Sequence, residues 1–138
     1  FNNMAIAIEK LVGQGQIKKA FILDFDLHEG DGNINTLGSR PYITILNPSR
    51  QSRSGYLEQV EKALNATDAD MIAAAAGFDN AEKDWGGLLK TEDYTTMGRM
   101  MRQAARRNLG GCFGILEGGY NHSVLGQNVL AFIEGLSN

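Results

Sequence analysis

Residues 71–79 read MIAAAAGFD, and this stretch decides the fold class. An unbroken apolar run closed by Gly77 is typical of a strand that is buried on both faces, as the strands of parallel sheets are. A carboxylate that follows such a strand is costly to bury without a partner or a cation. Asp79 is therefore either a cap or turn residue or a ligand of a bound ion.

Two further segments have the same form, with an apolar run that ends in polar residues. Residues 20–28 (AFILDFDLH) predict an alternating strand with Asp24, Asp26 and His28 on one face. Residues 112–120 (CFGILEGGY) predict a buried strand, then two glycines and Tyr120. Ligands of parallel sheets bind beyond the carboxyl ends of the strands, so we expect these polar side chains to lie at one edge.

Helical patterns separate these strands along the chain. The remaining elements predicted are a helix capped by Asn2 or Asn3 that ends near Gly13 or Gly15, a loop over residues 29–33, a strand over 42–46, and helices over 54–66, 91–108 and 121–136. Thr91 is the expected N-cap of its helix. The alternation predicts an α/β protein with a parallel sheet flanked by helices, in a single domain over residues 1–138.

Composition excludes several classes of protein. The 138 residues carry a formal net charge of −3, which argues against a nucleic-acid partner. No apolar run is long enough for a membrane span, and the N-terminus does not have the pattern of a signal peptide. The single cysteine, Cys112, predicts a small buried side chain and suits a reducing cytoplasm. The start at Phe1 and the 17 glycines lead us to expect a segment of a longer enzyme.

Asp26, His28 and Asp79 form a candidate metal site. Carboxylate oxygen and imidazole nitrogen are zinc ligands, and three protein ligands with one open position is the pattern of catalytic zinc. Asp24 lies deeper in the sheet and would instead orient a ligand or a catalytic group. The alternative is that residues 24–28 are only the water-exposed polar face of a strand.

Tyr120 follows two glycines, which let the backbone pass close to a substrate while the phenol donates a hydrogen bond to a developing oxyanion. Glu117 is a possible acid or base, or a structural hydrogen-bond acceptor. His122 begins the last predicted helix and is expected to be exposed or capping.

The segments FNNMAIA, LDFDLHEGDGN, AAGFDNAEKDWGGLLKTEDY and LEGGYN occur in this order over nearly the whole chain. As a set they resemble the C-terminal part of the histone deacetylase superfamily, which includes acetoin-utilisation proteins and acetylpolyamine amidohydrolases. The resemblance implies the arginase/deacetylase type of fold and a zinc-dependent amide hydrolase acting on acetylated amines. It implies that Asp26, His28 and Asp79 are zinc ligands and that Tyr120 polarises the acetyl carbonyl. Asp24 would support a catalytic histidine.

Two departures from the family pattern qualify this expectation. The family carries tandem histidines and tunnel-lining aromatic residues before the FNN segment, whereas this chain begins at that segment and has two histidines in all. Glu29 follows His28 where many relatives have histidine, glutamine or tyrosine. We therefore expect weak or no activity from this chain alone. Its exposed sheet edge would favour a homo-oligomer.

Two other readings remain open at the level of sequence. A haloacid-dehalogenase phosphatase also uses an Asp-x-Asp strand end, but His28 stands where threonine or valine is usual. The second alternative is a non-catalytic fragment that binds metal or serves a structural role and self-associates. The identity of the metal also stays open, because a site of two aspartates and a histidine accepts zinc or another divalent ion.

Overall fold

The computed structural model describes residues 2–138. Its sheet has four parallel strands in the order β2-β1-β3-β4. The strands are β1 (Ala20–Asp24), β2 (Ile43–Leu46), β3 (Met71–Ala76) and β4 (Gly111–Leu116). The helices are α1 (Asn3–Gly13), α2 (Asp31–Leu37), α3 (Arg53–Ala66), α4 (Thr91–Arg107) and α5 (His122–Ser137). The predicted α/β class with a parallel sheet is confirmed.

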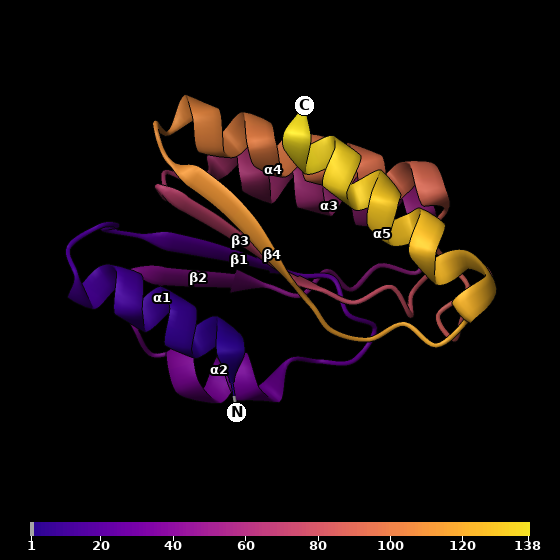
Figure 1. Cartoon of the computed structure of the whole chain (residues 1–138), viewed down its shortest axis with the longest axis horizontal. Helices are drawn as coiled ribbons and strands as arrows, with labels where there is room; N and C mark the ends of the chain where they lie inside the picture. Colours follow the sequence, from indigo (N-terminus) through magenta and orange to yellow (C-terminus); the bar gives the residue numbers. More distant parts are fainter. Residues whose placement is uncertain (1) are drawn as a thin grey trace.

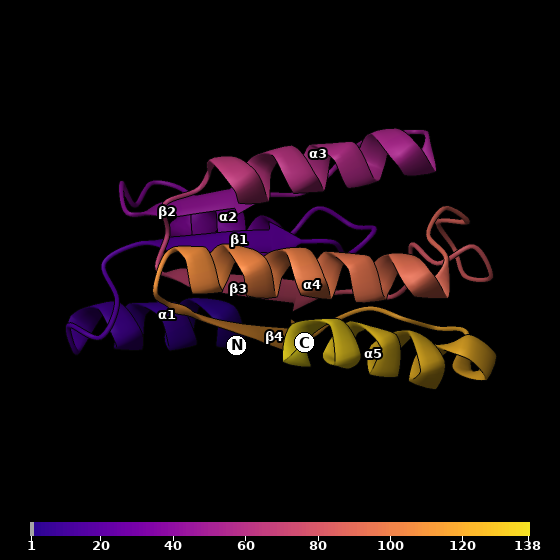
Figure 2. The ribbon, with the colours of Figure 1, turned by 90° about the horizontal axis from the view of Figure 1, so that it is seen from above.

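The sheet lies between two layers of helices. Helices α3, α4 and α5 cover one face, and α1 and α2 cover the other (Figures 1 and 2). In β1, Phe21 and Leu23 pack into the core under α3–α5, whereas Ile22 packs into the core over α1 and α2. The same division applies to Ile72 and Ala73 in β3, so this strand is buried on both faces as its composition predicted.

Strand β1 ends at Asp24, so the predicted strand over residues 20–28 was too long. Its pairing with β2 ends at Leu23 and its pairing with β3 ends at Asp24, after which only the Phe25 N–H donates to the Ala75 carbonyl of β3 at 3.1 Å. The Asp24 carboxylate then accepts the Asp26 N–H at 3.3 Å, which turns the backbone away from the sheet. Asp26 and His28 therefore lie on a bend rather than on one strand face with Asp24.

Helix α2 begins at Asp31, so the last three residues of the loop predicted over residues 29–33 are helical. Glycine and asparagine are weak helix formers, so propensity favoured a loop here. Leu37, at the end of α2, is fully buried in the core on this side of the sheet. Tertiary packing of that side chain explains why a short helix of low propensity forms.

The N-cap of α1 is the predicted residue, whereas the N-cap of α4 is not. Asn2 caps α1 as predicted, because its side chain accepts the Ala5 N–H at 2.9 Å. The cap of α4 is not Thr91 but Lys90, whose N–H donates to Asp93 at 2.8 Å. Thr91 instead donates to Asn128 of α5 at 2.7 Å, which ties the start of α4 to the neighbouring helix.

Strand β4 is at the edge of the sheet and is more exposed than predicted. Cys112 is half-buried rather than buried, and Leu116 is 64% exposed. Within residues 2–138, β4 pairs with β3 alone, so its other edge is open. None of the helices in this described part has the length and apolar character needed to cross a membrane.

Candidate metal centre

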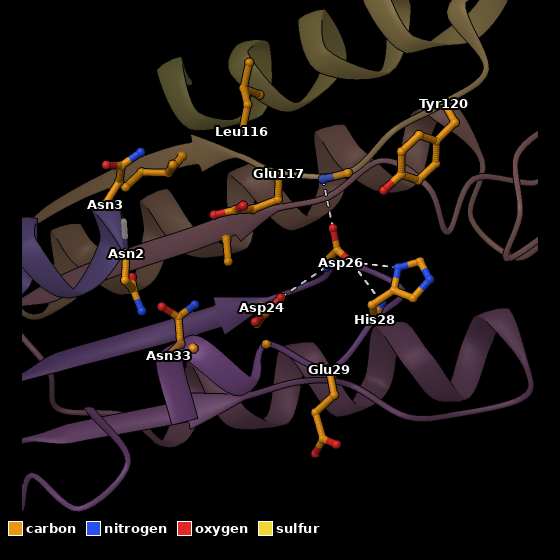
Figure 3. A pocket seen from close by; sticks show the side chains of 15 residues that line it. Asn2, Asn3, Asp24, Asp26, His28, Glu29, Asn33, Leu116, Glu117 and Tyr120 are labelled. Carbon is orange, nitrogen blue, oxygen red and sulfur yellow. Dashed lines mark hydrogen bonds and ion pairs between the residues drawn. The ribbon is translucent and has the colours of Figure 1, made fainter. Parts of the chain in front are cut away.

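The predicted site residues gather where the parallel strands end. Asp24 is the last residue of β1, and Asp26 and His28 lie on the bend that follows. Asp79 follows β3, and Tyr120 follows β4. Figure 3 shows Asp24, Asp26, His28 and Tyr120 around one hollow at this edge. The topology therefore brings together residues that are up to about a hundred positions apart in the chain.

Asp26, His28 and Asp79 each direct one ligand atom toward the others. These three atoms all lie within 4.8 Å of one another. His28 Nδ1 is 3.3 Å from Asp26 Oδ1 and 3.0 Å from Asp79 Oδ2. An ion about 2.1 Å from each atom in tetrahedral geometry would separate them by roughly 3.4 Å. The spacing and the donor set therefore fit a zinc-like divalent ion.

Backbone N–H groups hold both carboxylates in this orientation. Asp79 is fully buried, and its Oδ1 accepts the Leu27 N–H at 3.0 Å, which leaves Oδ2 toward His28. Asp26 accepts the His28 N–H at 2.9 Å on Oδ1 and the Gly118 N–H at 2.9 Å on Oδ2. Such outer hydrogen bonds fix ligand orientation in metal sites.

Glycines let the three strand ends approach this closely. A Cβ atom on Gly118 would lie 2.6 Å from Asp26 Oδ2 and 2.9 Å from Asp79 Oδ2. A Cβ on Gly77 would collide with Asp26 in the same way. Both positions therefore require glycine because the carboxylates occupy the space that a side chain would take.

Asp24 lies beside the three candidate ligands and is not one of them. Its side chain is 2% exposed, on the side of the hollow lined by Asn33 (Figure 3). Burial is the main cause that raises its pKa to about 6, and the neighbouring charge of Asp26 adds to it. The Asp26 N–H and the Asn33 side chain partly oppose this rise. Asp24 is thus a buried carboxyl group that lines the hollow.

The hollow beside this cluster has a volume of about 720 Å³ and is strongly acidic. Its lining includes the carboxylates of Asp24, Asp26, Glu29 and Glu117, with no lysine or arginine from residues 2–138. Burial, and secondarily the charge of Asp26, raises the pKa of Glu117. Such a cavity favours a cation.

Tyr120 also lines the hollow and is held by residues that sequence reasoning did not single out. Its ring stacks on Trp85 with 4.2 Å between centroids and 22° between planes. The Tyr120 N–H donates to Asp84 at 2.8 Å. A signal was present, because Trp85 is the only tryptophan and precedes two glycines in the loop after Asp79. By contrast, His122 is exposed and lies outside the hollow.

Fold and site together define an α/β protein with a candidate metal site of two carboxylates and a histidine at the carboxyl edge of a parallel sheet. The histone deacetylase domain family matches residues 1–56 and 48–136, so the chain belongs to this family. That membership decides against the haloacid-dehalogenase alternative, and it implies a divalent metal ion. The predicted family resemblance is confirmed.

Curated relatives match almost the whole of this chain. It is 24% identical to a probable deacetylase of Methanothermobacter thermautotrophicus, covering 99% of this chain and 51% of that protein. It is 24% identical to a histone deacetylase-like amidohydrolase of Pseudomonas aeruginosa, with coverages of 99% and 46%. It is 26% identical to the acetylpolyamine amidohydrolase of Mycoplana ramosa, with coverages of 99% and 50%. The chain thus spans about half the length of these relatives.

Solved structures share the fold. The histone deacetylase Clr3 matches with a TM-score of 0.81 and 23% identity, over 99% of this chain and 30% of that one. The acetylpolyamine aminohydrolase of Burkholderia pseudomallei matches with a TM-score of 0.76 and 20% identity, over 99% and 49%. The arginase/deacetylase type of fold predicted from the sequence is therefore confirmed, in a chain that corresponds to part of these proteins.

Proposed function

We propose that this chain supplies the metal-binding part of a zinc-dependent deacetylase that removes acetyl groups from acetylated amines. The observation that carries the proposal is the convergence of Asp26, His28 and Asp79, whose ligand atoms lie within 4.8 Å of one another. The relatives are named as deacetylases and as an acetylpolyamine amidohydrolase, which supports amide hydrolysis as the reaction class.

Each residue has a distinct role in this proposal. Asp26, His28 and Asp79 hold the ion, which when bound would polarise the amide carbonyl and acidify water. Tyr120, at the mouth of the hollow, donates its phenolic hydrogen to the carbonyl oxygen as negative charge develops there. Asp24 accepts a hydrogen bond from a proton-transferring histidine and keeps that ring oriented.

The proton-transferring group is the part that this chain does not supply. Its two histidines are His28, in the ligand cluster, and His122, which is exposed at the start of α5. General acid–base catalysis contributes about 10²–10⁴ in rate, so we expect the isolated chain to be at most weakly active. Turnover of an acetyl-lysine substrate near the enzyme median of about 10 s⁻¹ would contradict this expectation.

Metal content tests the proposal directly. The purified chain is loaded with zinc, desalted and analysed, beside the variants Asp79→Ala and His28→Ala. The matched control is Asp68→Ala, an exposed carboxylate that pairs with Lys19 away from the site. We expect one zinc per chain in the wild type and the control, and none in the two site variants.

The opposite result is equally informative. If the wild type retains no zinc, the three side chains do not form a metal site and the chain is a structural fragment. Zinc that is retained in both site variants would place the ion elsewhere and would also overturn the proposal.

A further inference from the structure

The loop that follows β3 is hydrogen-bonded to the turn that carries Tyr120. We call this contact, between residues 83–85 and residues 120–121, the clasp. Asp84 Oδ2 accepts two backbone N–H groups of that turn, from Tyr120 at 2.8 Å and from Asn121 at 2.7 Å. The Asn121 side chain donates back to the Lys83 carbonyl. Asp84 Oδ1 accepts the Trp85 N–H at 2.8 Å, which orders the loop itself. The two segments are therefore joined by hydrogen bonds in both directions.

An aromatic stack continues this contact toward the metal centre. The indole of Trp85 lies nearly parallel to the Tyr120 ring, with 4.2 Å between centroids. The His28 and Trp85 rings are T-shaped, with 5.9 Å between centroids and 82° between planes, so one indole lies against both the candidate ligand and the tyrosine. Trp85 is 67% exposed and Tyr120 is 49% exposed, so core burial does not hold these rings.

The Tyr120 turn needs such a restraint because of its backbone. Gly118 and Gly119 precede the tyrosine, and Gly119 has a φ of 143°, a conformation that other residues rarely adopt. Glycine loses more conformational freedom on ordering than any other residue. Tyr120, whose hydroxyl group would have to point at one place, thus follows two residues that lose much conformational entropy on ordering.

We propose that Asp84 and Trp85 are positioning residues for Tyr120. Asp84 fixes the backbone of the turn, and Trp85 fixes the plane of the ring at the mouth of the hollow beside His28. The catalytic meaning of this arrangement rests on the proposed function, whereas the clasp itself requires neither a metal nor turnover. The clasp would restrict the motion of the glycine turn and so orient the Tyr120 hydroxyl group as a hydrogen-bond donor.

Trp85 is the only tryptophan, so its fluorescence reports on the clasp. The stack covers one of the two indole faces, so Tyr120→Ala should raise acrylamide quenching of Trp85 by up to about twofold. Asp84→Ala should raise quenching in the same direction, because the freed turn carries the ring away. The double variant should be quenched no more than Tyr120→Ala, since both substitutions remove one stack.

Two further variants separate positioning from a general loss of structure. Asp84→Asn keeps an oxygen acceptor for the turn and should restore quenching toward the wild type. Glu82→Ala removes an exposed carboxylate from the same loop and should leave quenching unchanged. Because both residues lie on a surface loop, the helical circular dichroism of all variants should match the wild type.

Three results would overturn the inference. They are wild-type quenching in Asp84→Ala, additive effects in the double variant, and no rescue by asparagine. Zinc content measured on the same proteins keeps this test apart from the proposed function. A wild type that binds no zinc but shows the expected quenching pattern would refute the metal site and leave the clasp intact.

Discussion

Gly118 leaves room for two of the candidate metal ligands because it has no Cβ atom. A Cβ at this position would press on one oxygen of Asp26 and one of Asp79. Gly118→Ala should therefore displace both carboxylates and weaken zinc binding by about tenfold or more, as disturbing groups that orient metal ligands does. Isothermal titration of zinc measures this. Gly13→Ala, where a Cβ meets nothing within 4 Å, is the control and should bind as the wild type does.

Asp84 should make the clasp sensitive to acid. Desolvation acts to raise its pKa, but the N–H groups of Asn121, Tyr120 and Trp85 outweigh this and hold the pKa below the ordinary value of 3.8. The clasp is then complete above pH 3.8 and is lost as the pH falls through the lowered pKa. Acrylamide quenching of Trp85 should rise over that acidic range. An identical acid transition in Asp84→Asn would assign the change to other carboxyl groups.

The sequence predicted the three candidate ligands because each follows an apolar run, where an unpaired carboxylate or imidazole needs an explanation. It did not predict the roles of Asp84 and Trp85. Their contacts depend on how two irregular loops meet, and loop geometry leaves no periodic pattern in a sequence. Polar residues at strand ends can therefore be identified from the sequence as candidate ligands, whereas contacts between two loops cannot be predicted from it.

Helices α4 and α5 touch backbone to backbone through two glycines. A Cβ on Gly98 would lie 2.5 Å from the Phe132 carbonyl oxygen and 2.9 Å from the Leu136 nitrogen. Gly135 faces Gly98 from α5 with equally little room. This contact sets how closely α5 packs against α4, and α5 follows directly after the Tyr120 turn (Figure 2).

Gly98→Ala should force the two helices apart. Overpacking of this kind costs about 1–3 kcal/mol, so the free energy of unfolding should fall by that amount in a urea titration. Gly126→Ala in α5 meets no atom within 4 Å and serves as the control. It should stabilise the chain by about 0.5–1 kcal/mol through better helix propensity. Equal stability of the two variants would refute the close-contact interpretation.

Secondary elements were predictable to the extent that pattern and packing agree. Strand β3 was predicted with its observed bounds because its apolar run reflects burial on both faces. Strand β1 was overextended because alternation continues to His28 after its pairing with β3 has ended. Helix α2 was missed because burial of Leu37, rather than local propensity, stabilises it.

At the scale of the whole molecule, one edge of β4 is unpaired within residues 2–138. Figure 2 shows β4 and α5 on the same side of the molecule, and Leu116 of β4 and Leu130 and Ile133 of α5 are each more than half exposed. An uncovered sheet edge with apolar neighbours favours association with another chain. We propose that the isolated chain forms a homo-oligomer through this edge.

Leu116→Lys should shift the chain toward the monomer, because a charge on an edge strand opposes edge-to-edge pairing. Light scattering over a range of concentrations measures the change in mass. Leu109→Lys adds the same charge at an exposed apolar position outside β4 and is the matched control. A wild type that stays monomeric at high concentration would refute the proposal.

Four carboxylates lie at one end of the sheet and should lower the thermal stability of the metal-free chain: Asp24, Asp26, Asp79 and Glu117. Like charges held this close oppose folding until a cation joins them. Asp26→Asn should therefore raise the melting temperature of the metal-free chain. The same variant should retain less zinc after loading, so stability would be gained where metal binding is lost. The carboxylates best placed to bind a cation are then also a source of local frustration, because repulsion between them conflicts with the compact native state.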